Sequence, residues 1–408
     1  MELRDKRILI LGEGISGKGA FSALEGIAAR YFYYDGCLTS ATPDVIITSP
    51  GIAAHPALDY AKKNKIPVIS ELELGYLLNR SPVCAVTGTN GKTTVTRLIG
   101  DAVRGDYKTI VCGNIGDAFS ALARTPHKLA VVEVSSFQLL DCHEFRPDIA
   151  VITNITPDHL DRHGNMDNYI AAKMRIAKNQ TSDDFLICPL ALRPLAQGIS
   201  STVLYSGADT RVENGKIYFL NEPVMEAAAI SLTGEHNISN VLQSVCAAKL
   251  LGVANNMIRE AVQKFKSEPH RFSLVSRVFD KNWYDDSKAT NVAATLAACE
   301  SVKGDTALLL GGSDKGYTYE ELFLNLPDHV RVVYIMGEVR RKLAAAARGS
   351  EKSVVEVENL SEAVRLAAGS DVENVLLSPA AASFDCFQNY AQRGRAFAEA
   401  IEELGVRN

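Results

Sequence analysis

The segment VCAVTGTNGKTTVTRLIG, residues 83–100, most constrains what this chain can fold into. It combines an apolar strand, a glycine-rich turn and a helix that begins with Lys92 and Thr93. Backbone N–H groups of such a turn and of the helix N-terminus form a cradle for anions. The lysine adds charge at the outer phosphates, and the threonine hydroxyl reaches Mg²⁺. The segment therefore predicts binding of a nucleoside triphosphate by an α/β domain.

The loop departs from the usual P-loop spacing at one position. That pattern has a glycine five residues before Gly91, where this chain has Val86, and the earlier glycine is Gly88. The alternative is an incidental glycine turn between strand and helix, but GKTT at such a boundary has few other uses. We therefore predict that ATP contacts the following loop residues: Gly88, Thr89, Asn90, Gly91, Lys92, Thr93 and Thr94.

Short β-branched runs alternate with helical patterns along the whole chain, which is typical of βαβ units and mostly parallel sheets. At 408 residues the chain is too long for one compact core. A polar, proline-containing stretch, KSEPHRF at residues 266–272, separates the second series from the third. We predict an α/β protein of three domains: Rossmann-like at 1–81, P-loop-type and ATP-binding at 82–268, and Rossmann-like at 269–408.

Composition argues against several function classes. Acidic residues outnumber basic ones, 48 against 43, so the chain has no overall electrostatic signature of a nucleic-acid-binding protein. The eight cysteines include no CxxC pair, which predicts reduced and mostly buried thiols. The first residues contain an apolar run too short for a signal peptide or a membrane span. We expect a cytoplasmic protein.

A second glycine motif, GEGISG, lies near the amino terminus. Gly12, Gly14 and Gly17 follow a predicted strand, and Asp35 ends the next one, which is the spacing of a dinucleotide-binding fingerprint. An NAD-dependent oxidoreductase is therefore an alternative function, and tight packing without any ligand is another. Because the chain also has a loop for ATP, the motif favours a substrate that carries a diphosphate.

Acidic and imidazole side chains follow two strands of the predicted central sheet. Glu133 ends LAVVEVSS, while Asp158, His159 and Asp161 follow IAVITNI. The carboxyl ends of parallel strands meet at one edge, where the glycine-rich loop also lies. Carboxylates suit Mg²⁺, and imidazole is an acceptable partner. A loop that only caps a helix is the alternative, but three converging strand ends favour metal and phosphate chemistry.

The last domain offers cations beyond its strands. Lys288 in YDDSKATN and Lys315 in LGGSDKG could hold substrate carboxylates or be solvated loop charges, and the residues alone do not decide between these. In the tail, Phe384, Phe387 and Tyr390 recur at three-residue spacing, which predicts rings packed in the core.

The motifs GTNGKTT, EVSSFQL, NITPDHLDRH, AAKMRI, HNISN and HRF, in this order, resemble the Mur ligase family, which builds the peptide of bacterial cell-wall precursors. The resemblance covers essentially the whole chain. It implies a ligase that uses ATP and Mg²⁺ and joins two small molecules, UDP-N-acetylmuramoyl-L-alanine and D-glutamate. We expect a monomer. DDSKATN and SPAAASFDCFQNYAQRG resemble the D-glutamate-adding member. A sibling activity that adds another amino acid is the alternative.

The same resemblance implies residue roles. Lys92 and Thr93 would hold the ATP phosphates and Mg²⁺, Glu133 the same metal, and His159 a second metal together with Lys173 as a carbamate derived from CO₂. The UDP-linked substrate would face Ser16, Asn114, Ser135 and Gln138. The adenosine part would contact Asn237, Asn240, Arg271 and Asp286. D-Glutamate would contact Lys288, Thr290, Lys315, Ser383 and the backbone at Tyr390.

The chain departs from the family after Asp35, where it has Gly36-Cys37 and members of the family often have a Thr-Arg pair.

Activation of a carboxylate by ATP requires cations that offset the repulsion between the carboxylate and the phosphate oxygens. We assign that role to Lys92 and two Mg²⁺ ions. His159 is expected to be a metal ligand and not the base that deprotonates the incoming amine.

Overall fold

The computed structural model describes residues 1–28, 30–33, 42–104, 108–232, 234–266 and 268–407, with the side chains of residues 30, 32, 406 and 407 left out. It contains three sheets and divides into two compact units. The first unit comprises Met1–Ile155, Arg162–Ser231 and Asn237–Phe265. The second comprises Thr156–Asp161, Leu232–His236 and Lys266–Asn408. Asp35, Gly36 and Cys37 lie outside the described residues.

The N-terminal sheet has the strand order β2-β1-β3-β4, and its strands pair in parallel. Its elements are β1 (Arg7–Leu11), α1 (Ile15–Ala23), β2 (Arg30–Tyr33), β3 (Val45–Thr48), α2 (Pro56–Asn64), β4 (Val68–Ser70) and α3 (Glu71–Leu78). Gly12 has φ +94°, and a Cβ on Gly17 would lie 1.7 Å from the Gly12 carbonyl oxygen. The glycines therefore allow the β1 turn to pack directly against α1.

The central sheet has nine strands in the order β13-β12-β11-β10-β9-β8-β5-β7-β6. Strands from β6 to β11 pair in parallel, and β11, β12 and β13 form antiparallel pairs at the other edge. The strands are β5 (Val83–Thr87), β6 (Thr109–Gly113), β7 (Leu129–Glu133), β8 (Ile149–Ile152), β9 (Phe185–Pro189), β10 (Thr202–Ser206), β11 (Thr210–Glu213), β12 (Lys216–Phe219) and β13 (Glu222–Glu226). Because β7 and β8 flank β5 on opposite sides, the switch in strand order falls at the end of β5, where α/β sheets bind ligands.

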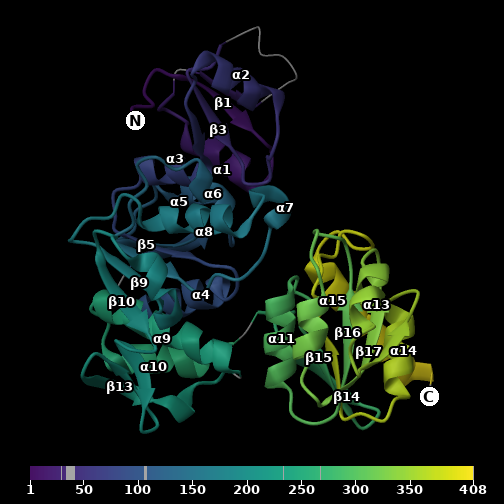
Figure 1. Ribbon diagram of the computed structural model, residues 1–408. Helices are drawn as coiled ribbons and strands as arrows, with labels where there is room; N and C mark the ends of the chain where they lie inside the picture. Colours follow the sequence, from purple (N-terminus) through teal and green to yellow (C-terminus); the bar gives the residue numbers. More distant parts are fainter. Residues whose placement is uncertain (29, 34–41, 105–107, 233, 267, 408) are drawn as a thin grey trace. The chain divides into compact units, whose positions relative to one another are not determined.

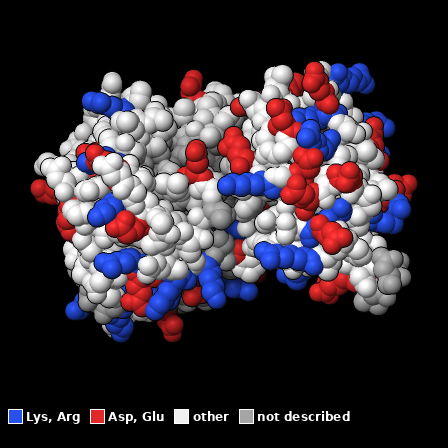
Figure 2. All heavy atoms as spheres, turned by 90° about the horizontal axis from the view of Figure 1, so that it is seen from below, with Lys and Arg blue, Asp and Glu red and all other residues white. Residues whose placement is uncertain are grey.

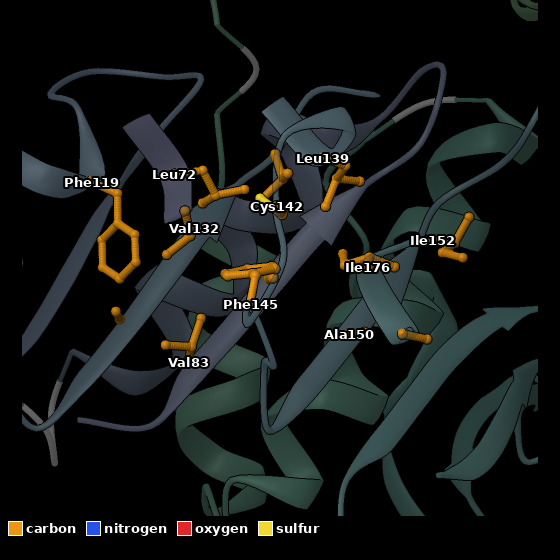
Figure 3. Packing of buried hydrophobic residues seen from close by; sticks show 14 of the residues in the cluster. Leu72, Val83, Phe119, Val132, Leu139, Cys142, Phe145, Ala150, Ile152 and Ile176 are labelled. Atoms are coloured by element: carbon orange, nitrogen blue, oxygen red, sulfur yellow. The ribbon is translucent and has the colours of Figure 1, made fainter. Parts of the chain in front are cut away.

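Helices cover this sheet, as Figure 1 shows. The helices between residues 92 and 264 are α4 (Lys92–Val103), α5 (Phe119–Leu122), α6 (Ser136–Leu140), α7 (Leu160–His163), α8 (Met166–Met174), α9 (Glu235–Leu250) and α10 (Asn255–Lys264). Figure 3 shows side chains of sheet and helices in one apolar cluster, among them Val83, Val132, Phe145 and Ile176, which are buried. Burial of such side chains from water is the main favourable term that holds the sheet and helices together.

Helix α5 joins the first two sheets within the first unit. A Cβ on Gly75 of α3 would lie 2.6 Å from Phe119, and one on Gly19 of α1 would lie 2.6 Å from Ala118. Glycine at both positions lets these helices approach α5 closely. The Ser120 backbone N–H also donates a 2.7 Å hydrogen bond to Oε1 of Glu71, a buried carboxyl whose pKa is raised by burial.

The second unit contains a six-stranded sheet with the order β14-β15-β19-β16-β17-β18, parallel except for the β14–β15 hairpin. Its elements are β14 (Ser273–Val278), β15 (Lys281–Asp285), α11 (Val292–Ser301), β16 (Thr306–Gly311), α12 (Glu320–Asn325), β17 (Val330–Met336), α13 (Arg340–Ala347), β18 (Ser353–Glu356), α14 (Leu360–Ala368), β19 (Asn374–Leu377) and α15 (Tyr390–Arg407). Figure 1 shows helices on its faces. Strands β15, β16 and β19 are adjacent, so the loops that follow them meet at one edge.

These sheets confirm the predicted α/β class with mostly parallel strands, while the exact domain boundaries stay predictions. Six of the described cysteines are buried and Cys386 is exposed. Within the described part of the chain, no helix is both long and apolar enough to span a bilayer. Acidic and basic side chains are interspersed over the face drawn in Figure 2, in keeping with the net charge of -5.

Candidate active site

The glycine-rich loop lies at the carboxyl end of β5, directly before α4. Its backbone is anchored to the chain after β8: the Thr89 N–H donates to the Asn154 carbonyl at 2.9 Å, and the Asn90 N–H donates to Asn154 Oδ1 at 2.9 Å. Thr153 and Asn154 in turn donate to the Asn90 carbonyl at 2.5 and 3.0 Å. Hydrogen bonds to the chain after β8 therefore fix the backbone of the loop.

Two glycines are required by the geometry of this loop. Gly88 has φ +145°, and a Cβ there would lie 1.9 Å from Thr153 Oγ1. Gly91 has φ +80°, and its Cβ would lie 2.3 Å from Asn240 Oδ1. A side chain at either position would collide with Thr153 or Asn240, so glycine is what lets the loop pack this closely. A glycine-rich turn before a helix fits a ligand bound by backbone N–H groups, such as a polyphosphate.

Two lysine ammonium groups converge on the Gly88 carbonyl oxygen. Lys92 Nζ donates to it at 2.9 Å and to the Thr89 carbonyl at 2.8 Å. Lys173, on α8, donates to the same oxygen at 2.8 Å, lies 4.5 Å from the centroid of the Tyr169 ring, and is only 2% exposed. The structure thus brings the predicted catalytic Lys92 and Lys173 to one atom of the phosphate loop.

Glu133 receives hydrogen bonds from two predicted site residues. The Thr93 hydroxyl donates to its Oε2 at 2.7 Å, and Asn114 Nδ2 donates to its Oε1 at 2.8 Å. Mg²⁺ is commonly bound through one or two carboxylates together with substrate phosphates. A hydroxyl and a buried carboxylate beside a phosphate loop are donors that fit this ion.

The other predicted residues of the first unit lie partly beside this loop and partly elsewhere. Asn240 Nδ2 donates to Asn237 Oδ1 at 3.1 Å at the start of α9, directly beside Gly91. Ser135 caps α6 and forms a reciprocal capping box with Gln138, which gives both a structural duty besides their predicted substrate contact. Ser16 is half-buried in the first turn of α1, a separate place at the N-terminal sheet.

Asp158 and His159 belong to the segment Thr156–Asp161 of the second unit. His159 has φ +54°, and its Nε2 lies 3.7 Å from Asp158 Oδ2. The structure groups Lys173 with the first unit, so the metal that His159 and Lys173 are predicted to share stays a prediction.

Asp158 is a buried carboxylate that contacts three residues of the second unit. Tyr317 donates a short hydrogen bond to Oδ1, the Lys315 ammonium lies 3.6 Å from Oδ1, and Asn291 donates to Oδ2 at 3.3 Å. Burial and the adjacent Asp158 charge raise the pKa of the Tyr317 hydroxyl. Lys315 is therefore an ordered cation and not a solvated loop charge.

Asp286 lies where β15 ends and is buried. Burial raises its pKa to about 7, although hydrogen bonds from Ser378 (2.9 Å to Oδ2) and from the Phe272 N–H (3.1 Å to Oδ1) act in the opposite direction. Arg271, whose charge also lowers this pKa, lies next to Phe272. The predicted adenosine-contacting pair of Arg271 and Asp286 is thus assembled within one unit.

The predicted amino-acid residues also gather in the second unit. Lys288 Nζ donates to the Tyr390 hydroxyl at 3.1 Å and lies 4.7 Å from its ring centroid. Ser383 is buried and Thr290 is half-buried, each in a loop that follows a strand. The prediction of core packing is wrong for Phe384, which is 73% exposed, whereas Phe387 packs against a buried cluster. Both rings precede α15, so helical spacing applies to neither of them.

Residues that were not predicted from the sequence shape both sites. The phosphate loop is held by Thr153 and Asn154. Both directly follow β8, the strand next to β5, and this position could have indicated that they contact the loop after β5. Arg393 is almost fully buried in α15. Its signal was helical spacing, because Arg393 lies four and eight residues before the buried Phe397 and Ile401, on the apolar face of the helix.

Comparisons with known proteins agree with this geometry. A family model described as the Mur ligase middle domain matches residues 86–248, and one described as the Mur ligase, glutamate ligase domain matches residues 270–380. The chain is 39% identical to the UDP-N-acetylmuramoylalanine--D-glutamate ligase of Koribacter versatilis (strain Ellin345), with 99% of each chain covered. It is also 39% identical to the protein of that name from Macrococcus caseolyticus (strain JCSC5402), with 97% of this chain and 98% of the relative covered.

Among solved structures, a MurF ligase from Thermotoga maritima in complex with ADP aligns with a TM-score of 0.67 at 17% identity, covering 100% of this chain and 97% of that chain. At this identity the similarity supports the fold. The ADP in that complex is a property of the Thermotoga protein.

Proposed function

Since the chain belongs to the Mur ligase family, we propose that it is an ATP-dependent ligase that joins D-glutamate to UDP-N-acetylmuramoyl-L-alanine. The observation that carries the ATP-dependent chemistry is the Thr93–Glu133–Asn114 cluster beside the phosphate loop. The two substrates follow from the names of the full-length relatives. We therefore do not favour an NAD-dependent oxidoreductase.

The reaction has two steps. The γ-phosphoryl group of ATP passes to the terminal carboxylate of the UDP-linked substrate, giving an acyl phosphate and ADP. The amine of D-glutamate then attacks the acyl carbon, phosphate leaves, an amide forms, and the amine loses a proton. Joining a carboxylate to an amine in water is uphill, so ATP supplies a leaving group that a free carboxylate lacks.

The chain's residues would serve the first step by placing positive charge where negative oxygens meet. Lys92, at the loop, would offset the charge of the transferring phosphoryl group. Thr93 and Glu133 would hold Mg²⁺, which when bound polarises the phosphate oxygens. Asn154 accepts hydrogen bonds from the N–H groups of Thr89 and Asn90 and so fixes the loop, and the remaining loop N–H groups would orient the phosphates.

We propose that Lys173 works as a carbamate formed with CO₂. Its amine is nearly fully buried beside the phosphate loop, where an ammonium group would repel Mg²⁺. A carbamate retains one N–H on Nζ, which can keep the hydrogen bond to the Gly88 carbonyl while two oxygens become available to a metal. An unmodified lysine that contacts phosphate directly is the alternative.

The two carboxylates of D-glutamate would bind in the second unit, to Lys288, Lys315, Thr290 and Ser383. A neutral side chain would leave buried donors unpaired, which costs affinity. The turn Gly12–Gly17 with Ser16 would receive the diphosphate of the other substrate.

We also propose that the enzyme works as a monomer in the cytoplasm. Light scattering coupled to size-exclusion chromatography tests the oligomeric state.

The deciding experiment measures release of ADP and phosphate by the purified protein with each substrate omitted in turn. We expect release to require ATP, UDP-N-acetylmuramoyl-L-alanine and D-glutamate. An amino-acid panel of L-glutamate, L-lysine, meso-diaminopimelate and L-alanine tests the specificity. Equal or better turnover with one of these would reassign the enzyme to a sibling activity, and nucleotide binding without turnover would make it a binding module.

A further inference from the structure

Arg393 is only 3% exposed, and its guanidinium lies where three loops of the second unit meet. Nε donates to Ser287 Oγ at 3.0 Å, and Nη2 donates to the Ser287 carbonyl at 2.8 Å and to the Ala381 carbonyl at 3.0 Å. Nη1 donates to the carbonyls of Gly311 at 3.2 Å and Ala382 at 3.1 Å. One side chain from α15 thus bonds to the chain at the carboxyl ends of three adjacent strands, β15, β16 and β19.

Each of those loops carries a residue predicted to contact the amino-acid substrate. Ser287 directly precedes Lys288, Ala382 directly precedes Ser383, and Gly311, the last residue of β16, directly precedes the loop that contains Lys315. A shift of any one loop would move its substrate-contacting side chain by a similar amount. Misplacement of a binding group by about 1 Å can cost about 10²-fold in rate.

Ser287 links this network to Tyr390, the residue that Lys288 contacts. Its hydroxyl donates to the Tyr390 carbonyl at 2.8 Å, and its N–H donates to Asp285 Oδ1 at 2.9 Å. Lys288 in turn donates to the Tyr390 hydroxyl. The position of the Lys288 ammonium is therefore set through Ser287 and Tyr390, both of which depend on where Arg393 lies.

Protein atoms accept hydrogen bonds from all N–H groups of the Arg393 guanidinium. A guanidinium has five N–H donors, and the five hydrogen bonds above use them. A Cβ on Gly312 would lie 2.9 Å from Nη1, so the loop after β16 packs directly against the group. Burial lowers the pKa of Arg393 to about 10, which still leaves it charged at neutral pH. Arg393 thus has no donor left for a substrate carboxylate.

We propose that Arg393 is a positioning residue for the amino-acid substrate: through Ser287, Gly311, Ala381 and Ala382 it holds the three loops in the arrangement that receives the two carboxylates. This inference rests on the proposed function. A lysine has one charged group with three donors and lacks the rigid fork of arginine, so it cannot replace these contacts.

The test compares steady-state phosphate release by wild type, Arg393→Lys, Arg393→Ala and the control Arg395→Ala, which removes the same charge from an exposed position of α15. For Arg393→Lys we expect the KM for D-glutamate to rise about tenfold or more. The KM for the UDP-linked substrate should stay within about twofold, because the residues predicted to contact it, Ser16, Asn114, Ser135 and Gln138, lie in the other unit. Arg395→Ala should match wild type. In Arg393→Ala, millimolar guanidinium should lower the D-glutamate KM, and methylammonium should not.

A folded Arg393→Lys protein with an unchanged KM for D-glutamate overturns the proposal, as does an equal rise in the KM for the UDP-linked substrate. If Arg393→Ala does not fold, the lysine variant alone decides. Failure of the proposed function is distinguishable, because wild type itself would then release no phosphate with D-glutamate.

Discussion

The Thr93 hydroxyl donates a 2.7 Å hydrogen bond to Oε2 of Glu133, which joins the first turn of α4 to the end of β7. Thr93→Val keeps the shape of the side chain but removes the hydroxyl that we assign to Mg²⁺. We expect the Mg²⁺ concentration for half-maximal phosphate release to rise about tenfold, corresponding to about 1.4 kcal/mol. Thr93→Ser, which keeps the hydroxyl, should stay near wild type. If Thr93→Val requires no more Mg²⁺ than Thr93→Ser does, the Thr93 hydroxyl does not bind the metal.

Lys92→Ala should abolish acyl-phosphate formation while the fold is retained. The ammonium contacts two loop carbonyls and is only half-buried, so its loss affects charge more than packing. We expect a decrease in ADP release of about 10²-fold or more and a urea midpoint close to wild type. The exposed Lys128→Ala is the matched control. Near-normal ADP release by folded Lys92→Ala protein would refute the prediction.

Gly91→Ala should weaken ATP binding because its Cβ would meet Asn240 Oδ1 at 2.3 Å. Gly215→Ala is the control: it has φ +75°, close to the +80° of Gly91, and nothing within 4 Å of the added Cβ. Both variants should lose about 1–2 kcal/mol from the left-handed backbone. Only Gly91→Ala should raise the KM for ATP, by about tenfold. Equal KM values would show that the contact with Asn240 does not shape the nucleotide site.

Stability of the second unit should depend on pH through Asp286, whose pKa burial raises from 3.8 to about 7. Because the folded state binds this proton more tightly, its stabilising contribution is full below the unfolded pKa and is lost as pH rises through about 7. Asp286→Asn lacks this proton. Its free energy of unfolding relative to wild type should therefore increase by roughly 1–3 kcal/mol between pH 5 and pH 8.

Urea unfolding followed by tryptophan fluorescence measures this effect, since Trp283 is the single tryptophan of the chain and lies buried in β15. The signal therefore reports on the second unit. A difference between Asp286→Asn and wild type that stays constant from pH 5 to pH 8 would contradict the raised pKa.

Lys173→Ala should lose most activity and recover part of it with acetate or formate, which can supply the oxygens of the missing carbamate. Small amines should not restore activity. Lys178→Ala, an exposed lysine just after the same helix, is the control and should keep wild-type turnover. Rescue by an amine, or full activity of wild type after thorough removal of CO₂, would overturn the carbamate assignment.

Much of the fold could be predicted because its signals are local. Strands β5, β7, β8 and β16 are buried on both faces, so each appears in the sequence as a continuous apolar run. The strands from β10 to β13 were not predicted. They are short and partly exposed, and pairing with neighbours defines them more than composition does.

The candidate site likewise has parts that the sequence predicted and contacts that it did not predict. The sequence by itself determined the phosphate loop, because Gly88, Gly91 and Lys92 are adjacent in the chain and their chemistry depends on local backbone geometry. It also placed Glu133 at the same sheet edge, since parallel strands end together. The contact between Thr93 and Glu133, and the five hydrogen bonds of Arg393, were decided only by the tertiary structure. Apart from the bonds of Arg393 to Ala381 and Ala382, these bonds join residues at least 40 positions apart in the chain. Which donor reaches which acceptor depends on how the packed elements bring their loops together.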